Sequence, residues 1–251
     1  MKTEILYGIN PVFEALKAGK RKIHQIYIAA HKTSGRISKI VKFAESKKIP
    51  VKKVKATQLK SIAGTGQHQG VSARVNPYPM ADLSDITDSE PGKGNHLFLL
   101  LLDNVLDPQN LGAIIRTALG VGISGIILPK DRSAMPTPAV SKSSAGAIEH
   151  VRLIRVTNMV DTIRILKKQG AWIVGLDQEA EKTVYSSDLT GSLAIVIGGE
   201  AKGIRPLVKK NCDFIASIPQ TGQLNSLNAS VAAAIAMYEA FRQRRIAGNQ
   251  E

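Results

Sequence analysis

Three polar segments of this chain carry residue types that could perform chemistry. The first runs from Asp103 to Asn110 and continues into an apolar stretch that contains Arg116. The second, Gly198 to Gly203, places Glu200 directly after two glycines, and the third runs from Pro219 to Asn228. A guanidinium in an apolar context needs a carboxylate or a phosphate as partner, and adjacent glycines allow a ligand or another backbone to approach closely. These residues alone leave two interpretations open, a structural Arg–carboxylate pair and a ligand site.

The third segment precedes a stretch of strong helix formers. The chain from 229 to 245 contains no Gly or Pro, and Asn225, Ser226 or Asn228 can cap a helix that begins there. Its apolar side chains leave almost no polar face before Glu239, and a helix that is apolar all round is usually buried on all sides. We therefore expect a buried helix whose first turn presents free backbone N–H groups to the polar segment.

The elements that must position these segments are short apolar runs of strand length. Helical patterns separate most of the runs, notably at 110–119, which Asn110 can cap, and at 158–169. Such an alternation indicates a mainly parallel sheet covered on both faces, and ligands of such sheets bind at the carboxyl ends of the strands. The predicted fold class is α/β. The predicted strands are 97–102, 125–128, 151–156, 172–176, 193–197 and 214–218.

The N-terminal third has a separate pattern. Asn10 and Pro11 are suited to begin a helix, and an amphipathic helix is predicted over 36–48, with short strands and a further helix after it. These elements form a small α/β domain over residues 1–76. Residues 77–95, with three prolines and four carboxylates, are interpreted as a linker to a second domain at 96–251. The remaining predicted elements of the first domain are strands 26–29, 51–54 and 71–75, helix 57–63 and a polar loop at 64–70.

The charge of the chain is unevenly distributed. Of the net +14, residues 1–80 hold 16 Lys and Arg against 3 Asp and Glu, whereas residues 81–251 hold 18 against 17. This asymmetry indicates an N-terminal module for a polyanion. Nucleic acid is favoured over a membrane surface, because no continuous basic amphipathic helix carries bulky aromatic anchors. General solubility charge is the alternative interpretation.

The composition also argues against several classes of protein. A single cysteine, Cys212, excludes an intramolecular disulfide and fits a reducing compartment. The N-terminus lacks the apolar core of a signal peptide, and the run Leu99–Leu102 is far shorter than the ~20 residues of a transmembrane helix. The histidines are scattered without a standard metal-ligand spacing. We expect a cytoplasmic protein with no metal and no membrane partner.

The three polar segments together match a known family. NVLDPQNLGAIIRTA (104–118), IVIGGEAKGI (195–204) and IPQTGQLNSLNASVAAAIAMYEA (218–240) resemble the three motifs of the SpoU/TrmH family of RNA ribose 2′-O-methyltransferases, within the SPOUT superfamily. YGINPVFEAL (7–16) and HQGVSARV (68–75) are similar to the substrate-binding domain joined to many of these enzymes, itself similar to small ribosomal RNA-binding proteins. The two resemblances cover most of the chain outside the linker.

The resemblance implies a trefoil-knotted catalytic domain, a homodimer, and S-adenosylmethionine as cofactor held in the knot. It also assigns site residues by motif. The residues that it implies for the cofactor are Gly198, Gly199, Ile218, Pro219 and Leu227. The residues that it implies for the active site are Asn110, Arg116, Glu200, Ser226 and Asn228.

Two roles for Arg116 follow from the resemblance. The family proposal makes this arginine the general base, but a guanidinium stays protonated at neutral pH. The alternative has Arg116 bind the target phosphate and stabilise the developing 2′-oxyanion, with Glu200 orienting Arg116 and with Ser226 and Asn228 positioning the ribose. Cys212 lies away from the three motifs and is expected to be idle, which argues against cytosine C5-methylation through a cysteine nucleophile.

Three functions are compared. The N-terminal pattern joined to this catalytic domain most resembles the enzymes that methylate one guanosine of 23S rRNA in the peptidyl-transferase region. A tRNA 2′-O-methyltransferase of the same family is the second hypothesis. A non-catalytic RNA-binding factor in ribosome assembly is the third, and the complete set of motif residues argues against it.

Overall fold

The computed structural model describes residues 2–30, 34–87, 96–200, 202–222 and 226–247. The chain forms two compact units, each described here by itself. The N-terminal unit comprises Met1–Pro79 and Met135–His150, and the C-terminal unit comprises Met80–Ala134 and Val151–Glu251. No helix among the described residues is long and apolar enough to cross a membrane.

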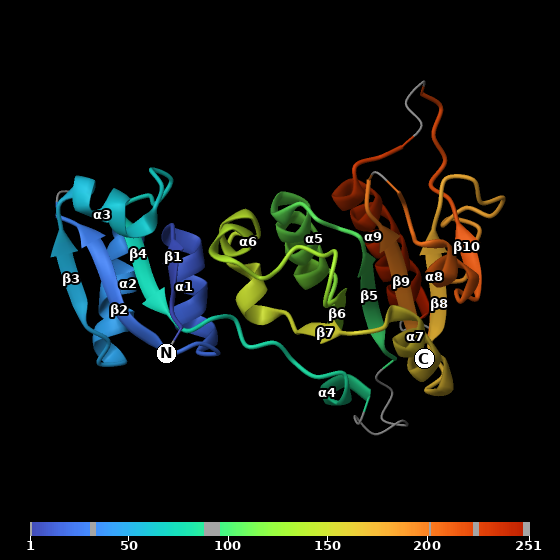
Figure 1. Ribbon diagram of the computed structural model, residues 1–251, viewed down its shortest axis with the longest axis horizontal. Coiled ribbons are helices and arrows are strands. Elements are labelled where there is room, and N and C mark those ends of the chain that lie inside the picture. Colours follow the sequence, from blue (N-terminus) through green and yellow to red (C-terminus); the bar gives the residue numbers. More distant parts are fainter. Residues whose placement is uncertain (1, 31–33, 88–95, 201, 223–225, 248–251) are drawn as a thin grey trace. The chain divides into compact units, whose positions relative to one another are not determined.

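The N-terminal unit is built on a mixed four-stranded sheet in the order β1-β4-β2-β3 (Figure 1). β4 is antiparallel to both β1 and β2, whereas β3 is parallel to β2. β1 was not predicted, because its sequence EILY places two apolar residues side by side and gives no alternating pattern. The elements are β1 (Glu4–Tyr7), α1 (Ile9–Ala18), β2 (Ile23–Ala29), α2 (Gly35–Ser46), β3 (Val51–Val54), α3 (Ala56–Ala63), β4 (Val71–Val75), α6 (Pro138–Ser143) and the 3₁₀ helix η1 (Ala147–His150).

Alternation along the strands of this unit buries both faces of its sheet. Ile26 and Ile28 of β2 pack with apolar residues of α1 and α2, including Leu16 and Ile40. Tyr27 and its neighbours on the opposite face pack with α3. Two helices therefore cover one face and one short helix covers the other, which accounts for a buried core in so small a unit.

Residues 135–150 belong to the N-terminal unit although they lie between two strands of the C-terminal sheet in sequence. Their attachment includes a buried ionic cluster, in which Arg21 contacts Glu149 at 2.7 Å and Glu4 at 3.3 Å. Arg21 also donates a hydrogen bond to Ser141. Burial raises the pKa of Glu149, and the Arg21 guanidinium opposes that rise. The N-terminal unit is therefore discontinuous in sequence, whereas the predicted division had continuous segments.

The C-terminal unit is built on a six-stranded, all-parallel sheet in the order β10-β8-β9-β5-β6-β7 (Figure 1). This confirms the predicted α/β class with a mainly parallel sheet. The elements are α4 (Ser84–Thr87), β5 (Phe98–Asp103), α5 (Pro108–Gly120), β6 (Gly125–Pro129), β7 (Leu153–Val156), α7 (Met159–Lys168), β8 (Trp172–Leu176), β9 (Leu193–Gly198), α8 (Pro206–Lys210), β10 (Phe214–Ala216) and α9 (Ala229–Ala247). The trefoil knot that the resemblance implies stays a prediction.

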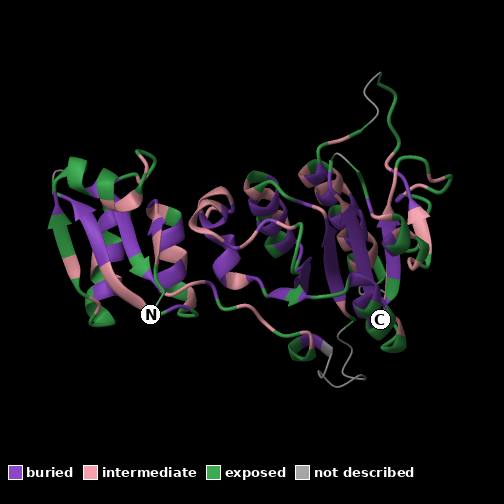
Figure 2. Ribbon diagram, in the orientation of Figure 1, coloured by how far each residue is buried: buried purple, intermediate pink, exposed green. Residues whose placement is uncertain are grey.

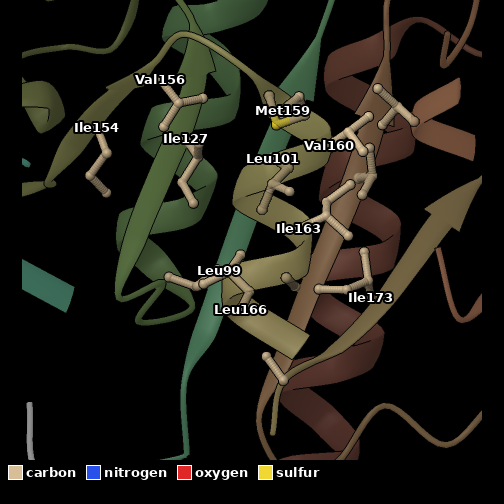
Figure 3. Close-up of a cluster of buried hydrophobic side chains, with 14 of the residues drawn as sticks. Leu99, Leu101, Ile127, Ile154, Val156, Met159, Val160, Ile163, Leu166 and Ile173 are labelled. Carbon is tan, nitrogen blue, oxygen red and sulfur yellow. The ribbon is translucent and has the colours of Figure 1, made fainter. Parts of the chain in front are cut away.

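Helices cover both faces of the parallel sheet. Leu99 and Leu101 of β5 point toward α7, where they meet Ile163 and Leu166 in an entirely apolar cluster (Figure 3). α8 adds Val208 to this cluster. α5 and α9 pack against each other behind the sheet in the same view. The central strands β5, β6 and β9 are consequently buried almost throughout, whereas the outer strands β7, β8 and β10 have exposed or half-buried positions (Figure 2).

The predicted linker is in part a packed element of the C-terminal unit. Ala81 pairs with Ile154 in an isolated parallel bridge, and Ile86 of α4 is 2% exposed within the core. Residues 88–95 of the predicted linker lie outside the described residues. The prolines and carboxylates that suggested a linker therefore flank a short helix whose one buried isoleucine holds it to the sheet.

The prediction that α9 is buried on all sides is wrong for the single chain. Val231, Tyr238 and Ile246 are 46%, 53% and 49% exposed, and the buried face is formed mainly by alanines and Met237. Glu239, expected to begin a polar face, is instead buried. The helix therefore presents bulky apolar side chains to its surroundings and small ones to the sheet.

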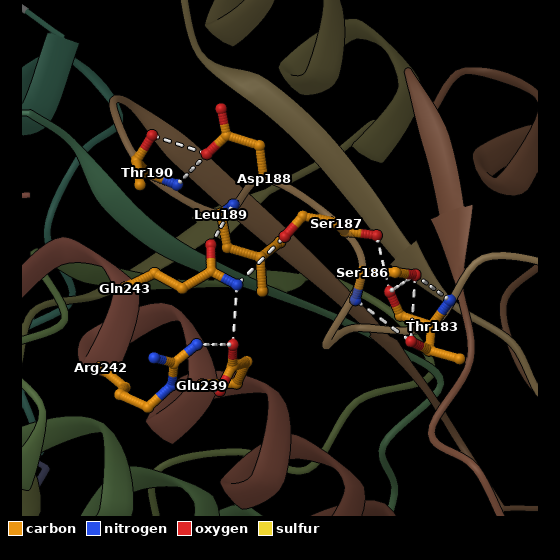
Figure 4. A network of polar contacts seen from close by, with 9 residues as sticks. All are labelled: Thr183, Ser186, Ser187, Asp188, Leu189, Thr190, Glu239, Arg242 and Gln243. Carbon is orange, nitrogen blue, oxygen red and sulfur yellow. Dashed lines mark hydrogen bonds and ion pairs between the residues drawn. The ribbon is translucent and has the colours of Figure 1, made fainter. Parts of the chain in front are cut away.

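Glu239 is buried because it organises a polar network between α9 and the segment 183–190 (Figure 4). Its carboxylate accepts hydrogen bonds from Arg242 and from Gln243. Gln243 in turn accepts from the backbone N–H of Leu189 at 2.8 Å and donates to the carbonyl of Ser187 at 3.1 Å. The network thereby attaches α9 to an irregular segment that is otherwise tied to the sheet by an isolated bridge between Thr183 and Ser217.

Candidate active site

A cavity of about 460 Å³ lies at the carboxyl ends of β8, β9 and β10. This is the edge of a parallel sheet at which ligands bind. Its walls combine apolar side chains with backbone from glycines and with several carboxylates. The lining residues are Leu176, Asp177, Gln178, Glu179, Ile197, Gly198, Gly199, Glu200, Lys202, Gly203, Ala216, Ile218, Gln220, Ser226, Leu227, Ala229 and Ala232.

Two glycines at the end of β9 are required by close backbone contact. A Cβ on Gly199 would lie 2.1 Å from the carbonyl oxygen of Asn104, and a Cβ on Gly198 would lie 2.2 Å from the carbonyl carbon of Gly203. Distances this short are impossible for real side chains. The glycines predicted from sequence thus allow the loop after β9 to fold back on itself and to pass directly against the end of β5.

Glu200 is held by donors from two helices. Its Oε1 accepts hydrogen bonds from Asn110 Nδ2 at 3.0 Å and from the side-chain amide of Asn228. The backbone N–H of Ala229 lies 3.4 Å from the same oxygen. Asn228 Nδ2 also donates to Asn110 Oδ1 at 3.0 Å, which closes a three-membered cluster. The structure therefore brings together one predicted residue from each of the three polar segments.

The helix starts explain how two asparagines reach one carboxylate. α5 is capped by Asp107, whose Oδ1 accepts from the Gln109 N–H at 2.9 Å, so the prediction that Asn110 is the cap is wrong. Asn110 is thereby left to point its amide at Glu200. Asn228 does cap α9, because its Oδ1 accepts from the Ser230 N–H at 2.9 Å while its Nδ2 serves the cluster.

Arg116 stands apart from this cluster. It lies on α5 with an exposed side chain, and it forms no hydrogen bond or ion pair with the residues that the structure describes. The predicted pairing of Arg116 with Glu200 is therefore wrong in this chain. The apolar neighbours that suggested a buried arginine occupy the inner face of α5, and Arg116 occupies the outer face, where its guanidinium is available to a ligand.

The other predicted residues divide between the cavity and its surroundings. Gly198, Gly199, Ile218 and Leu227 line the cavity, as does Ser226, whereas Pro219 is exposed and is absent from the lining. The sequence interpretation missed the segment 176–179, which lines the cavity from the end of β8. The signal was present, since three polar residues follow a predicted strand at the same edge of the sheet as the chosen segments.

Asp177 in this missed segment carries an ion pair beneath the cavity. Lys209 Nζ lies 2.6 Å from its Oδ2. Burial acts to raise the pKa of Asp177, but hydrogen bonds from Lys209 and from the Glu179 N–H outweigh it and lower the pKa overall. Asp177 thus stays negative at neutral pH and pins α8 to the cavity wall.

Cys212 has the properties of a structural thiol. Burial raises its pKa to about 11, so the thiol is protonated at neutral pH. Its sulfur lies 3.5 Å from the carbonyl oxygen of Val208, at the end of α8. A protonated thiol is a weak nucleophile, and this supports the view that Cys212 takes no part in chemistry. No group of three or more His, Cys, Asp or Glu suited to a metal occurs among the described residues.

The fold and the site define an α/β enzyme class in which a glycine loop and the start of the last helix form a cavity at one sheet edge. Residues 97–238 match the SpoU rRNA Methylase family, and residues 5–81 match the RNA 2′-O ribose methyltransferase substrate binding family. The chain belongs to the SpoU rRNA methylase family, as the three motifs predicted.

Relatives of similar length extend this assignment. The chain is 41% identical to a putative TrmH family tRNA/rRNA methyltransferase, YacO, of Bacillus subtilis, with 98% of each chain covered. It is 38% identical to the 23S rRNA (guanosine-2′-O-)-methyltransferase RlmB of Xylella fastidiosa, again with 98% of each covered.

Solved structures agree with the fold. An S-adenosylmethionine-bound rRNA methyltransferase from Sinorhizobium meliloti superposes with a TM-score of 0.79 at 25% identity, covering 96% of this chain and 87% of its own. A TrmH/SpoU tRNA-modifying enzyme of A. aeolicus matches with a TM-score of 0.55 at 29% identity, covering 61% of this chain and 77% of its own. The tRNA-modifying enzyme thus has a counterpart for only part of the chain.

Proposed function

We propose that this protein transfers a methyl group from S-adenosylmethionine to the ribose 2′-hydroxyl of one guanosine in 23S rRNA, in the peptidyl-transferase region. The observation that carries the proposal is the cluster of Asn110, Glu200 and Asn228, assembled at the rim of a cavity from all three motifs. The relative in Xylella fastidiosa, whose name specifies 2′-O-methylation of a guanosine in 23S rRNA, supports the choice of substrate.

The cavity suits the cofactor in size and in chemistry. Its volume of about 460 Å³ falls within the roughly 300–1,000 Å³ of small-molecule sites. Ile218, Leu227 and the glycine backbone offer an apolar wall for an adenine ring, while the carboxylates of Glu179 and Glu200 face a ligand that carries positive charge. When bound, S-adenosylmethionine supplies an electrophilic methyl group on a sulfonium.

The chain's own residues would align the ribose and manage its charge. Glu200 fixes Asn110 and Asn228 in one geometry, so their amides and Ser226 form a preorganised polar surface beside the cavity. As the 2′-hydroxyl gives up its proton to a base, negative charge develops on the oxygen, and formation of the bond to the methyl group then removes that charge. Arg116, exposed and unpaired among the described residues, binds the neighbouring phosphate and stabilises this charge.

The N-terminal unit would supply most of the contacts to RNA phosphates. Its excess of positive charge includes the exposed Lys52 and Lys53 on the edge strand β3. Contacts to phosphates set affinity and register, while unpaired bases in a loop or bulge carry the sequence information. We expect binding to 23S rRNA to weaken steeply with salt because counterions are released.

We further propose that the protein is a homodimer that acts in the cytoplasm, where its rRNA substrate is made. The apolar side chains that α9 exposes support the dimer, because Tyr238, Phe241 and Ile246 line a second, shallow hollow with Tyr185. Large exposed apolar patches mark contact surfaces. A Tyr238→Glu variant should be monomeric by light scattering, and a dimer of unchanged stability would contradict the use of this face.

The decisive experiment is labelled methyl transfer to unmodified 23S rRNA and, separately, to tRNA, followed by alkaline hydrolysis. We expect label in an alkali-resistant dinucleotide from 23S rRNA, because a 2′-O-methyl group blocks cleavage of the next phosphodiester. Label in ordinary mononucleotides would contradict ribose methylation. Activity on tRNA alone would establish the second hypothesis, and failure of the pure protein to bind S-adenosylmethionine would favour a non-catalytic assembly factor.

A further inference from the structure

Asp103 is a fully buried carboxylate at the carboxyl end of β5, next to the cavity loop. Its Oδ2 accepts a hydrogen bond from the backbone N–H of Arg205 at 2.8 Å. Its Oδ1 accepts from Arg205 Nε at 2.8 Å and lies 2.6 Å from Arg205 Nη2. A buried charge is tolerated only when it is paired and hydrogen-bonded. Among the described residues, Asp103 meets this condition for its side chain through Arg205, which makes the two side chains one unit.

The backbone of Asp103 holds the other end of the same loop. Its carbonyl oxygen accepts from the Gly199 N–H at 2.8 Å, and the Gly199 carbonyl accepts from the Gly203 N–H at 2.8 Å. We call residues 199–205 the Glu200 loop; Ala201 within it lies outside the described residues. One residue on β5 therefore fixes where this loop begins, through its main chain, and where it ends, through its carboxylate.

The Glu200 loop needs such an external constraint. Gly198 directly precedes it and it contains Gly199 and Gly203, and glycine loses more conformational freedom on ordering than any other residue. Yet Glu200 must keep one oxygen within hydrogen-bond distance of Asn110 and Asn228 on two separate helices. Gly198 and Gly199 cannot be replaced by stiffer residues, since backbone occupies their Cβ positions, and Gly203 has a φ of +59°, which L side chains rarely adopt. Rigidity must come from contacts at the ends of the loop.

We propose that Asp103 and Arg205 are positioning residues that clamp the Glu200 loop and thereby set the geometry of the Glu200 carboxylate and of the cavity wall. The inference rests on the role proposed for Glu200. It goes beyond that role by assigning a function to two residues outside the three-residue cluster. Asp103 lies in the protein interior, and Arg205, whose side chain is 38% exposed, binds it from the surface side.

The first test compares two ion-pair variants of the C-terminal unit. Arg205→Met removes both side-chain bonds to Asp103 and keeps the backbone bond to its Oδ2. Because Asp103 then stays buried without its cation, this variant should also lose stability, and the rates are compared under conditions in which circular dichroism shows both variants folded. Lys167→Met is the control, because it removes an ion pair with Asp213 in the same unit, and neither residue lines the cavity. The lysine is 34% exposed, close to the 38% of Arg205, whereas Asp213 is 24% exposed and Asp103 is fully buried. Misplacement by a fraction of an ångström lowers rates steeply, so we expect kcat to fall about tenfold in Arg205→Met and less than about twofold in the control. Equal rates in the two variants would overturn the proposal.

The second test separates positioning from general loss of stability. Arg205→Lys keeps a cation that reaches one Asp103 oxygen and should recover kcat to within about threefold of wild type. In a Glu200→Gln background, adding Arg205→Met should cost less than about twofold, because residues that act through one another are non-additive. A full tenfold loss in that background would show that Arg205 acts otherwise than through Glu200.

A third measurement makes failure of the clamp distinguishable from failure of the role of Glu200. Hydrogen exchange of the backbone amides at Gly199 and Gly203 reports loop order without any catalysis. We expect faster exchange in Arg205→Met than in Lys167→Met, and unchanged exchange would refute the clamp. If exchange accelerates while Glu200→Gln retains the wild-type rate, the clamp stands and the catalytic role of Glu200 is wrong.

Discussion

Both units contain a glutamate held by residues from distant parts of the chain, and the two glutamates differ in their partners. Glu149 of the N-terminal unit is fully buried and faces the guanidinium of Arg21. Glu200 of the C-terminal unit is exposed and is held by two amides and a backbone N–H, with no cation at hydrogen-bond distance among the described residues. The charge of the Glu149 carboxylate is balanced by Arg21 and shielded from solvent. The Glu200 carboxylate is held in one orientation, but its charge remains accessible to a ligand.

The difference teaches how to tell a structural carboxylate from a functional one. A buried charge that loses its partner is strongly destabilising, so its partner serves the fold. Amide donors orient a carboxylate without cancelling its charge, so a carboxylate held by amides stays available for chemistry. The comparison predicts that substitutions at the first cluster change stability and that substitutions at the second change catalysis.

The largest effect is expected for Arg21→Met, which leaves Glu149 buried without its cation. The free energy of unfolding should fall by about 3–5 kcal/mol, the usual loss when one partner of a buried pair is removed. Urea denaturation of the full chain measures it. The loss should be smaller at acidic pH, because Glu149 is then protonated and no unpaired charge is buried. In wild type, Arg21 opposes the rise in the pKa of Glu149 that burial causes. Without Arg21 that pKa rises further, and stability is lost as pH increases through the range between its ordinary 4.5 and the raised value.

Arg164→Met is the control for this first prediction. It removes a pair with Asp161 in which both side chains are more than half exposed, 64% and 56%. Exposed pairs contribute about 0–1 kcal/mol. If Arg21→Met costs no more than this control, the N-terminal cluster is not structural and the comparison between the units fails.

The second largest effect is expected for Glu200→Gln, in catalysis rather than in stability. Removing the charge while keeping the shape should lower kcat about 100-fold, the scale of losing one preorganised electrostatic group. The free energy of unfolding should change by less than about 1 kcal/mol, because Glu200 is exposed. Initial rates of methyl transfer and urea denaturation measure the two quantities. Glu181→Gln, at another exposed glutamate of the unit and outside the cavity lining, should leave both unchanged.

Local signals in the sequence were sufficient for most of the fold. The six strands of the parallel sheet follow apolar runs, and the polar segments after β5 and β9 lie at its carboxyl edge. Short elements with weak periodicity were missed, namely the edge strand β1 and the short helices α4, α6 and α8. The packing of residues 135–150 with the N-terminal unit was not foreseen, because Arg21 lies 128 positions away from its partner Glu149 and no local pattern encodes such a pairing.

The site was predicted in composition but only in part in its contacts. Glycines 198 and 199 were found because a strand followed by two glycines suggests close approach, and Asn110 and Asn228 were found by motif. The pairing of Glu200 with Arg116 was predicted wrongly because an arginine among apolar residues was expected to be buried and to need a carboxylate or phosphate partner, whereas Arg116 faces outward from α5. Which face of a helix a residue occupies depends on how the helix packs, and that is decided by tertiary structure.

Arg116→Lys is expected to lower kcat less than Glu200→Gln does. The variant tests whether catalysis needs the guanidinium of Arg116, since the Glu200 cluster contains no cation among the described residues. A lysine keeps the charge but loses the planar fork that binds phosphate bidentately, so kcat should fall about tenfold. Stability should change by less than about 0.5 kcal/mol, because Arg116 is exposed and unpaired among the described residues. The pH dependence of kcat is the measurement. Retained activity with a shifted pH profile would mean that a guanidinium fork is unnecessary and that Arg116 serves proton transfer.

The smallest effect is expected for Glu239→Gln, where the C-terminal unit has a charge pair of its own (Figure 4). Hydrogen bonds from Arg242 lower the pKa of Glu239 below its ordinary 4.5, although partial burial opposes this. Because the folded pKa is lowered, the stabilisation is present above pH 4.5 and is lost as pH falls through the lowered value. Arg242 is 58% exposed, so water screens the pair and the loss of stability at neutral pH should be small. Urea denaturation at neutral and at acidic pH measures the difference between the variant and wild type. If the difference in stability between the variant and wild type grows as pH falls, the pKa of Glu239 is raised rather than lowered. Glu239 would then resemble the buried Glu149 of the N-terminal unit and not the charged Glu200.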